Sequence, residues 1–188
     1  MVQQVEQRHG RLYKPSMDGR VFHAATAVSG VAPGTAVGTT AAFALYNPSG
    51  SGVVIAIQKA AIAYLSGTLG AGMLVHCVNS NLGEAVPTGT AITEKSAIAG
   101  GGGYGAAKGV ALTTATLAVA PSVVRPIGSL QASLASTAVG GWQLNDDVEG
   151  AIILPEGGSY SIQGIAAAGS SPLVVVGVTW EEIPTGVE

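Results

Sequence analysis

Residues 53–65 read VVIAIQKAAIAYL, and this stretch decides the fold class. Bulky apolar side chains stand at every second position in its first half, which is the period of a half-buried β-strand. The next bulky residues, Ile62 and Tyr64, fall on the opposite parity. One extra residue near Gln58–Lys59 would re-aim the strand, so the sequence predicts a β-bulge at that point.

Short apolar segments continue on both sides of this stretch, separated by clusters of Gly, Pro, Asn and Ser. That spacing is typical of many short strands rather than of helices. The predicted strands are Val21–Val28, Thr40–Tyr46, Val53–Leu65, Met73–Asn79, Thr90–Ile98, Val110–Val119, Val123–Ala135, Gly150–Leu154, Tyr160–Ala167 and Leu173–Glu182. We therefore expect an all-β protein, an antiparallel β-sandwich of the jelly-roll or a related Greek-key type.

Several predicted strands are apolar on both faces, and Leu173–Glu182 is the clearest example. A two-sided apolar strand in an antiparallel sheet implies that something covers the outer face. A partner subunit would serve, and so would the Ala-rich segments Ala106–Ala120 and Ser129–Ala138, which we expect to be strand or loop. The sequence leaves these two sources of cover open.

Composition points to self-association. Only 10% of the 188 residues are charged, against roughly 25% for an ordinary soluble domain. A monomer with so few charges is poorly protected against association. We expect a homo-oligomer, with a trimer favoured and a dimer as the runner-up. No apolar run reaches the ~18 residues of a membrane-spanning helix, and the start of the chain has no apolar signal-peptide core.

Charge is distributed unevenly along the chain. Residues 1–20 are the most polar stretch and are interpreted as an extended arm, followed by a sandwich domain over residues 21–188. The predicted partner-binding residues of this arm are Arg8, Arg11, Leu12, Tyr13, Lys14 and Arg20. Beyond Arg125 all charged side chains are acidic, so arm and C-terminal part could attract each other between subunits; two ordinary solvated ends are the alternative. The basic residues are too few for a nucleic-acid footprint.

Patterns that carry chemistry are mostly missing from the sequence. No serine has the glycine spacing of a nucleophile elbow, and the three histidines are not spaced as metal ligands. His76 and the single cysteine, Cys77, are adjacent on a predicted strand and should point to opposite faces. The glycine run 100–105 is best explained as a loop tip, because the dinucleotide motif needs a helix after it and an acidic residue about twenty positions on. We expect no enzymatic activity and no cofactor.

Two binding functions remain open. Asn145–Glu149 is an acidic cluster, which we expect to be a solvated turn or an interface contact; calcium binding is the alternative, although the EF-hand spacing is missing. Trp142, Trp180 and the tyrosines are expected in the core, but a groove lined by them would bind carbohydrate.

Four stretches together resemble small jelly-roll proteins encoded in the structural gene clusters of tailed bacteriophages. They are residues 45–52 (LYNPSGSG), 64–72 (YLSGTLGAG), 154–160 (LPEGGSY) and 178–184 (VTWEEIP). Some members of that group are cement, or decoration, proteins of the capsid. The resemblance implies a structural virion protein on the capsid surface, made in the host cytoplasm, that binds itself and a major capsid protein, without an active site. A receptor- or glycan-binding module of a phage tail or head fibre is the alternative.

Overall fold

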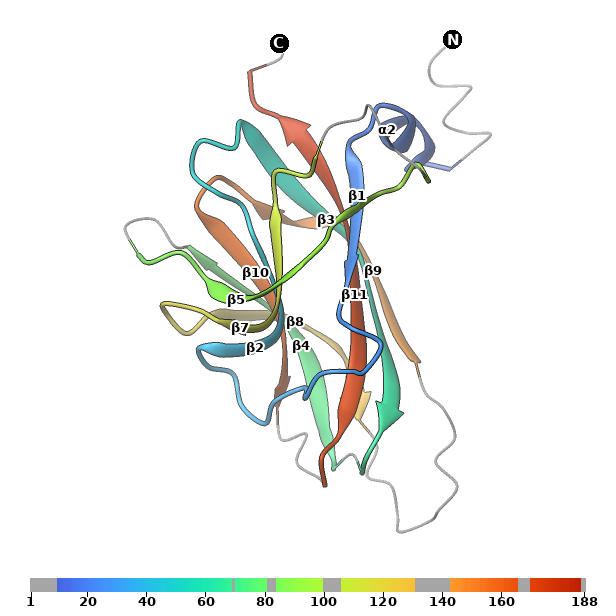
Figure 1. Ribbon diagram of the computed structural model, residues 1–188, viewed down its shortest axis with the longest axis vertical. Coiled ribbons are helices and arrows are strands. Elements are labelled where there is room, and N and C mark those ends of the chain that lie inside the picture. The colour runs from blue at the N-terminus through green and yellow to red at the C-terminus, as the bar shows by residue number, and fades with distance from the viewer. Residues whose placement is uncertain are drawn as a thin grey trace.

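The computed structural model describes residues 10–68, 70–80, 84–99, 106–130, 143–165 and 170–186. Two sheets pack against each other (Figure 1), which confirms the predicted antiparallel β-sandwich. The elements are α2 (Tyr13–Met17), β1 (Val21–Ala25), β2 (Thr40–Tyr46), β3 (Val53–Ser66), β4 (Gly72–Ser80), β5 (Thr88–Ile92), β6 (Lys95–Ser96), β7 (Val110–Thr116), β8 (Ser122–Leu130), β9 (Gln143–Leu154), β10 (Gly158–Ile165) and β11 (Leu173–Pro184).

Sheet A has the strand order β6-β1-β11-β3-β9, and sheet B has the order β5-β7-β2-β10-β4-β8. The chain changes sheet at almost every connection; within the described strands it stays in one sheet only from β4 to β5 and from β7 to β8. Neighbours in a sheet therefore come from distant parts of the sequence. This arrangement leaves β8 and β9 as edge strands on the same side of the sandwich.

The predicted bulge in β3 is confirmed. Ile57 pairs with Trp180 and Lys59 pairs with Thr179, so Gln58 has no partner of its own in β11. Because of this extra residue, Ile57 and Ile62 both face the core although their numbers differ in parity.

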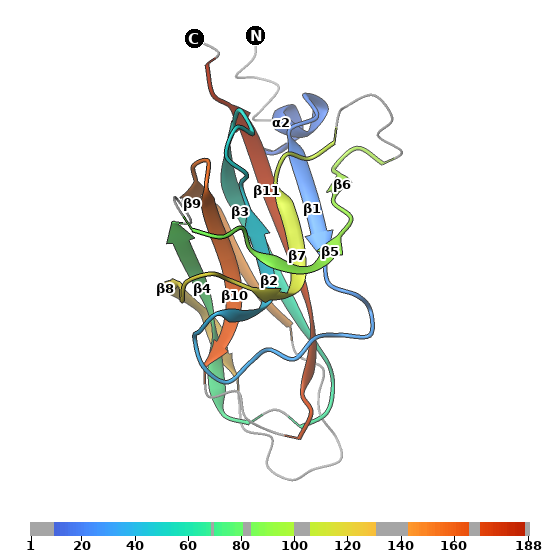
Figure 2. The same cartoon turned by 60° about the vertical axis from the view of Figure 1, so that its left-hand side comes forward.

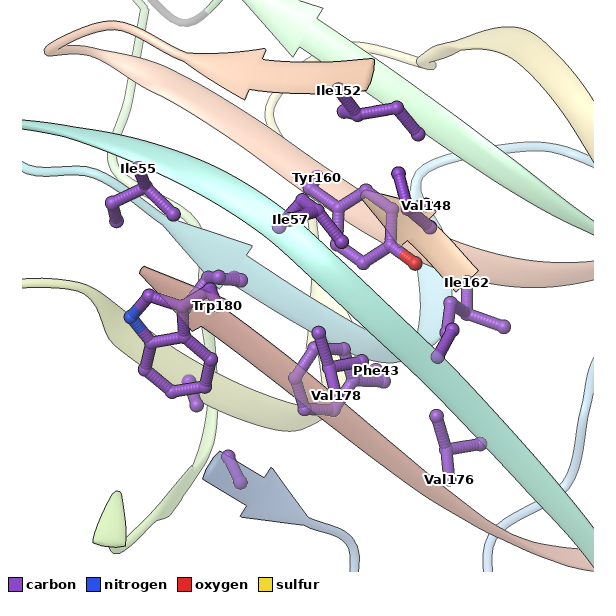
Figure 3. Close-up of a cluster of buried hydrophobic side chains, with 14 of the residues drawn as sticks. Phe43, Ile55, Ile57, Val148, Ile152, Tyr160, Ile162, Val176, Val178 and Trp180 are labelled. Carbon is purple, nitrogen blue, oxygen red and sulfur yellow. The ribbon is translucent and has the colours of Figure 1, made fainter. Parts of the chain in front are cut away.

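The core lies between the sheets and is mostly aliphatic. Trp180, Tyr160 and Phe43 are its largest apolar side chains, and each is fully buried. Figure 3 shows these rings in one cluster with aliphatic side chains of both sheets, among them Ile57, Ile162 and Val178. A core of this kind accounts for the alternation of strands β3, β10 and β11, since every second residue faces it.

The outer face of sheet B is covered by the chain itself. Gln163 points outward from β10, donates to the Gly38 carbonyl oxygen at 3.0 Å and accepts from the Gly38 N–H at 2.9 Å. The Gly164 N–H donates to the Pro33 carbonyl oxygen at 2.7 Å. The loop from β1 to β2 is therefore one source of the cover that the two-sided apolar strands require.

A second covering segment follows β7. Leu117 is buried in a small apolar cluster with Ala44 and Leu112, and the Val119 carbonyl oxygen accepts from the Asn79 side chain at 3.0 Å. The Ala-rich stretch 106–120 thus supplies part of the cover, as strand and loop. Within the described residues, the cover of sheet B comes from the same chain; the other Ala-rich stretch lies mostly outside them.

Several predicted strands have other bounds in the structure. Val21–Val28 and Val110–Val119 end earlier, at Ala25 and Thr116. The stretch 90–98 forms two short strands, β5 and β6, in different sheets. The end of the stretch 123–135 lies outside the described residues. β9 begins at Gln143 rather than at Gly150, because the acidic cluster 145–149 is part of an edge strand and not a turn. An edge strand with one solvated face tolerates charges that a central strand would not.

The prediction of an extended arm is wrong for Tyr13–Met17, which form one turn of helix, α2. The Ser16 and Asp18 N–H groups donate to the Leu12 and Lys14 carbonyl oxygens. Pro15 is tolerated because the first N–H groups of a helix have no partner within the helix. The part of the prediction that concerns residues 1–9 lies outside the described residues.

Candidate interaction surface and buried polar network

Residues 10–20 cross one end of sheet A, and we call them the N-terminal strap. Arg20, just before β1, contacts Glu181 of β11 through Nη1 and Oε1 at 3.4 Å. Arg11 contacts Glu149 of β9 through Nη1 and Oε2 at 3.0 Å. These strands lie in the order β1-β11-β3-β9, so a strap that begins at β9 and ends at β1 spans most of this end of the sheet. Figure 2 shows α2 beside the start of β1 and the end of β11.

The other predicted arm residues that the structure describes make no ion pair with the sandwich. Lys14 pairs with Asp18 inside the strap. Tyr13 is 40% exposed, and α2 has no buried residue. Leu12 is half-buried at the start of the helix, and Arg8 lies outside the described residues. The attraction between the basic N-terminal part and acidic strands is therefore seen within one chain, and among the described residues Arg11 and Arg20 carry it.

Below the strap, the outer face of sheet A is open in the described structure. A hollow of about 400 Å³ lies over the middle of β1, β11 and β3. Its floor is built of small residues, including Ala25, Ala61 and Gly177, and its rim carries the basic side chains His23, Lys59 and Lys95. Small side chains allow another backbone to approach closely. This surface, which we call the open face, is suited to packing and offers no enclosed cavity for a small molecule.

The acidic cluster does not form a metal site. Asp146 points into the sandwich, whereas its neighbour Asp147 points outward and contacts Lys59 at 3.3 Å. Glu149 pairs with Arg11. Successive side chains of a strand point to opposite faces, so these carboxylates diverge and each meets a different cation. Within the described residues, no group of His, Cys, Asp and Glu could hold a metal ion.

Asp146 belongs to a polar network that connects the two sheets. Its Oδ2 lies 2.7 Å from His76 Nε2 of β4, and its Oδ1 accepts a hydrogen bond from Arg125 of β8. His76 Nδ1 lies 2.7 Å from the Tyr160 hydroxyl of β10. His76 and Tyr160 are fully buried. Burial lowers the pKa of His76, although the bond to Asp146 opposes this, and burial raises the pKa of Tyr160 well above its usual value.

This network is closed to substrates because its two central rings have no exposed surface. Cys77 cannot join it, since it pairs with Ser161 and faces away from the core. Burial raises the pKa of its thiol to about 11, which keeps it protonated at neutral pH. The network was missed from the sequence, although a signal exists: His76 alternates with Leu74 and Val78, which both face the core.

Glu182 is a second buried acidic residue that the sequence did not single out. Its carboxylate accepts hydrogen bonds from the Lys108 and Gly109 N–H groups at 2.9 and 2.8 Å. The indole N–H of Trp180 donates to it at 3.1 Å. Trp180 and Glu182 are two residues apart on β11 and therefore point to the same face. The burial expected for Trp180 could thus have predicted a buried carboxylate at Glu182. Glu182 thus fixes the segment before β7 to the end of β11.

The described aromatic side chains are mainly part of the core. Trp180, Tyr160 and Phe43 are fully buried, and Tyr46 is nearly so. Trp142 and Tyr104 lie outside the described residues. Stacking against a sugar ring usually needs exposed Trp, Tyr or Phe rings in a groove, and no such residue is among the described residues that line the open hollow.

Comparison with known proteins gave no match: no family model, no curated protein and no solved structure is similar to this chain. No described helix is long and apolar enough to cross a membrane.

Proposed function

We propose that this protein is a structural component of a tailed-phage virion, a cement protein that binds the outside of the capsid and stabilises the shell. In this proposal it acts in several copies, as a homotrimer or, as the runner-up, as a dimer, and it contacts the major capsid protein beneath it. It performs no catalysis and needs no cofactor. It is made in the host cytoplasm and ends up on the capsid surface.

The observation that carries this proposal is the difference between the two outer faces. Sheet B is covered by segments of its own chain, whereas the middle of sheet A presents small residues around an open hollow. With only 10% charged residues in the whole sequence, an exposed surface of this kind favours packing against another protein. The strap at the end of the same face extends the area that a neighbouring subunit could contact.

The strap also supports a role in assembly, because it is attached weakly. The ion pair that holds its far end, Arg11–Glu149, involves two exposed side chains, and such pairs contribute only about 0–1 kcal/mol each. Tyr13 and Met17 stand one helical turn apart and are 40% and 49% exposed, so part of their apolar surface is accessible to a neighbouring subunit. In a shell, burial of such side chains at each copy would add up over many copies.

The test is electron cryomicroscopy of virions from a phage that encodes this protein. We expect sandwich-shaped density on the outside of the capsid at threefold or twofold positions, with sheet A or the strap facing a neighbour. Absence of the protein from the particle would reject the proposal, and density confined to a tail or head fibre would favour the receptor-binding alternative.

A second test uses the purified protein. Light scattering should give the mass of a trimer or dimer rather than that of the 18.5 kDa chain. A variant without residues 1–20 should keep the β-sheet circular dichroism spectrum but lose capsid binding or oligomer stability. Ala61→Glu, which adds a charge to the floor of the open face, should weaken oligomers; Glu84→Gln, at an exposed position, is the control. A stable monomer at high concentration would contradict self-association.

A further inference from the structure

The network of Arg125, Asp146, His76 and Tyr160 joins sheet A to sheet B at the side where β8 and β9 are edge strands. Asp146 is its contribution from sheet A, and the other side chains come from sheet B. A second contact supports the junction: the space beside Gly128 of β8 is filled by the Leu144 side chain of β9. The first half of β9 is therefore fixed to sheet B by one apolar contact and one polar network.

The network is fully satisfied only when His76 is neutral. One ring nitrogen then donates to a carboxylate and the other accepts, which fits a single tautomer. Nε2–H donates to Asp146, and Nδ1 accepts from the Tyr160 hydroxyl. Each buried group has a partner of the correct kind.

Protonation of His76 breaks this pattern. Both ring nitrogens become donors, so the Tyr160 hydroxyl can no longer donate to Nδ1 and its hydrogen is left in the core. A buried donor without an acceptor costs about 1–3 kcal/mol. In addition, two cations, the imidazolium and Arg125, would then share one carboxylate in a largely buried site.

We propose that this network is an acid-sensitive latch, which holds residues 143–147 of β9 against sheet B and releases them when His76 is protonated. The inference rests on the fold and does not depend on the proposed function. The release is confined to residues 143–147 because the ladder between β3 and β9 is irregular next to them. Ile57 pairs with Ile152 and Lys59 with Asp147, so residues 148–151 interrupt the ladder between the two halves of β9.

The direction of the pH effect follows from the surroundings of His76. The groups that face it or influence it are Asp146 from β9, Arg125 from β8, Tyr160 from β10 and the adjacent Cys77. Tyr160 and Cys77 have raised pKa values and stay neutral in acid. Burial keeps the pKa of His76 in the closed state below 6.5, whereas an opened, solvated His76 has the ordinary value. Opening therefore becomes easier as the pH falls below about 6.5.

The consequence extends to the strap. Glu149, which holds Arg11, lies two residues after the latch segment, in the irregular part of β9, and has a positive φ of 58°. Residues 143–147 also pair with residues 59–63 of β3. Release from sheet B leaves this ladder at the edge of sheet A as their remaining support, and so weakens the order on one side of this anchor. Acid should therefore loosen the Arg11 end of the strap, while the Arg20 end stays fixed to β11.

The test is amide hydrogen exchange of the full-length protein between pH 7.5 and 4.5, corrected for the intrinsic pH dependence of exchange. The opening constant of residues 143–147 should rise in acid, by about tenfold for each unit by which burial has lowered the pKa of His76. The amides of β11 serve as the internal reference and should change less. Equal behaviour of both strands, or no acid-induced opening of residues 143–147, would overturn the proposal.

Two variants separate the latch from other effects of acid. In His76→Gln the side chain does not titrate, and the additional opening of residues 143–147 in acid should disappear. His23→Gln removes the other described histidine, whose pKa burial also lowers, and should keep the effect. If His76→Gln does not fold, an NMR titration of the wild-type histidine rings decides: protonation of His76 without a change in the amides of residues 143–147 would reject the latch.

Discussion

The Glu182 carboxylate lies 2.8 Å from the backbone nitrogen of Gly109, and a Cβ atom on Gly109 would be only 3.4 Å from the same carboxylate. The end of β11 and the segment before β7 are thus joined by a buried charge that backbone N–H groups and an indole satisfy. A carboxylate in such a place stabilises only as long as its donors remain, and the donors depend on it equally.

Glu182→Ala is expected to destabilise the protein by roughly 2–4 kcal/mol, because the Trp180 indole and two backbone N–H groups lose their acceptor inside the protein. The measurement is the midpoint of urea unfolding at neutral pH. Glu84→Ala, at an exposed position, is the control and should leave the midpoint unchanged. If both variants unfold at the same urea concentration, the carboxylate of Glu182 is not a structural contact.

Gly164→Ala should displace the loop that covers sheet B. An added Cβ would lie 2.6 Å from the Gly34 carbonyl oxygen and 2.8 Å from that of Pro33. We expect a loss of about 1–3 kcal/mol, the usual cost of overpacking, together with faster exchange of the Gly38 amide. Gly38→Ala is the matched control because a Cβ there meets no atom within 4 Å. An unchanged Gly38 amide in Gly164→Ala would show that the loop does not depend on this close approach.

Deletion of Gln58 should prevent folding, whereas Gln58→Ala should be tolerated. The deletion removes the residue that changes the parity of β3, so all later side chains of the strand would turn to the wrong face. The substitution keeps the length and the bulge. Circular dichroism and near-ultraviolet spectra of the two variants make the comparison. A folded deletion variant would mean that the bulge can move along the strand.

The stability of the turn 47–52 should depend on pH through Glu156. Its carboxylate accepts from the Gly50 and Gly52 N–H groups at 2.9 and 2.8 Å, and these bonds lower its pKa. The contribution to stability is therefore present above the ordinary glutamate pKa and is lost as the pH falls through the lowered value. NMR should show the amide shifts of Gly50 and Gly52 moving together in acid, and Glu156→Gln should abolish that step. A step that persists in the variant would have to arise from another group.

The sequence was informative about strands and uninformative about polar contacts, for a physical reason. Alternation and turn residues report local burial, and they located β2, β3 and the bulge at Gln58. A buried polar network depends on strands that are distant in sequence, as His76 and Asp146 are, and local patterns carry no information on such pairing. The cluster 145–149 was expected to be a solvated turn or an interface contact, because charged residues are usually exposed to solvent. It is part of an edge strand instead, and such a strand can point one carboxylate inward and the next outward.

The predicted arm shows the same limit. Composition singled out its basic residues, but it could not show that Arg11 and Arg20 would meet acidic residues of their own chain. Nor could it show that Tyr13–Met17 would form a helical turn.

The position of β11 has a consequence for biosynthesis. It lies in sheet A between β1 and β3 and pairs with both, yet it is translated after the other strands that the structure describes. The nascent polypeptide cannot complete this sheet until β11 has left the ribosome. Until then β1 and β3 lack the strand that lies between them and pairs with both. The sandwich therefore cannot complete its folding before β11 is available, and sequence-distant pairing makes this step slow. During that interval β1 and β3 expose unpaired strand edges, which are prone to aggregation.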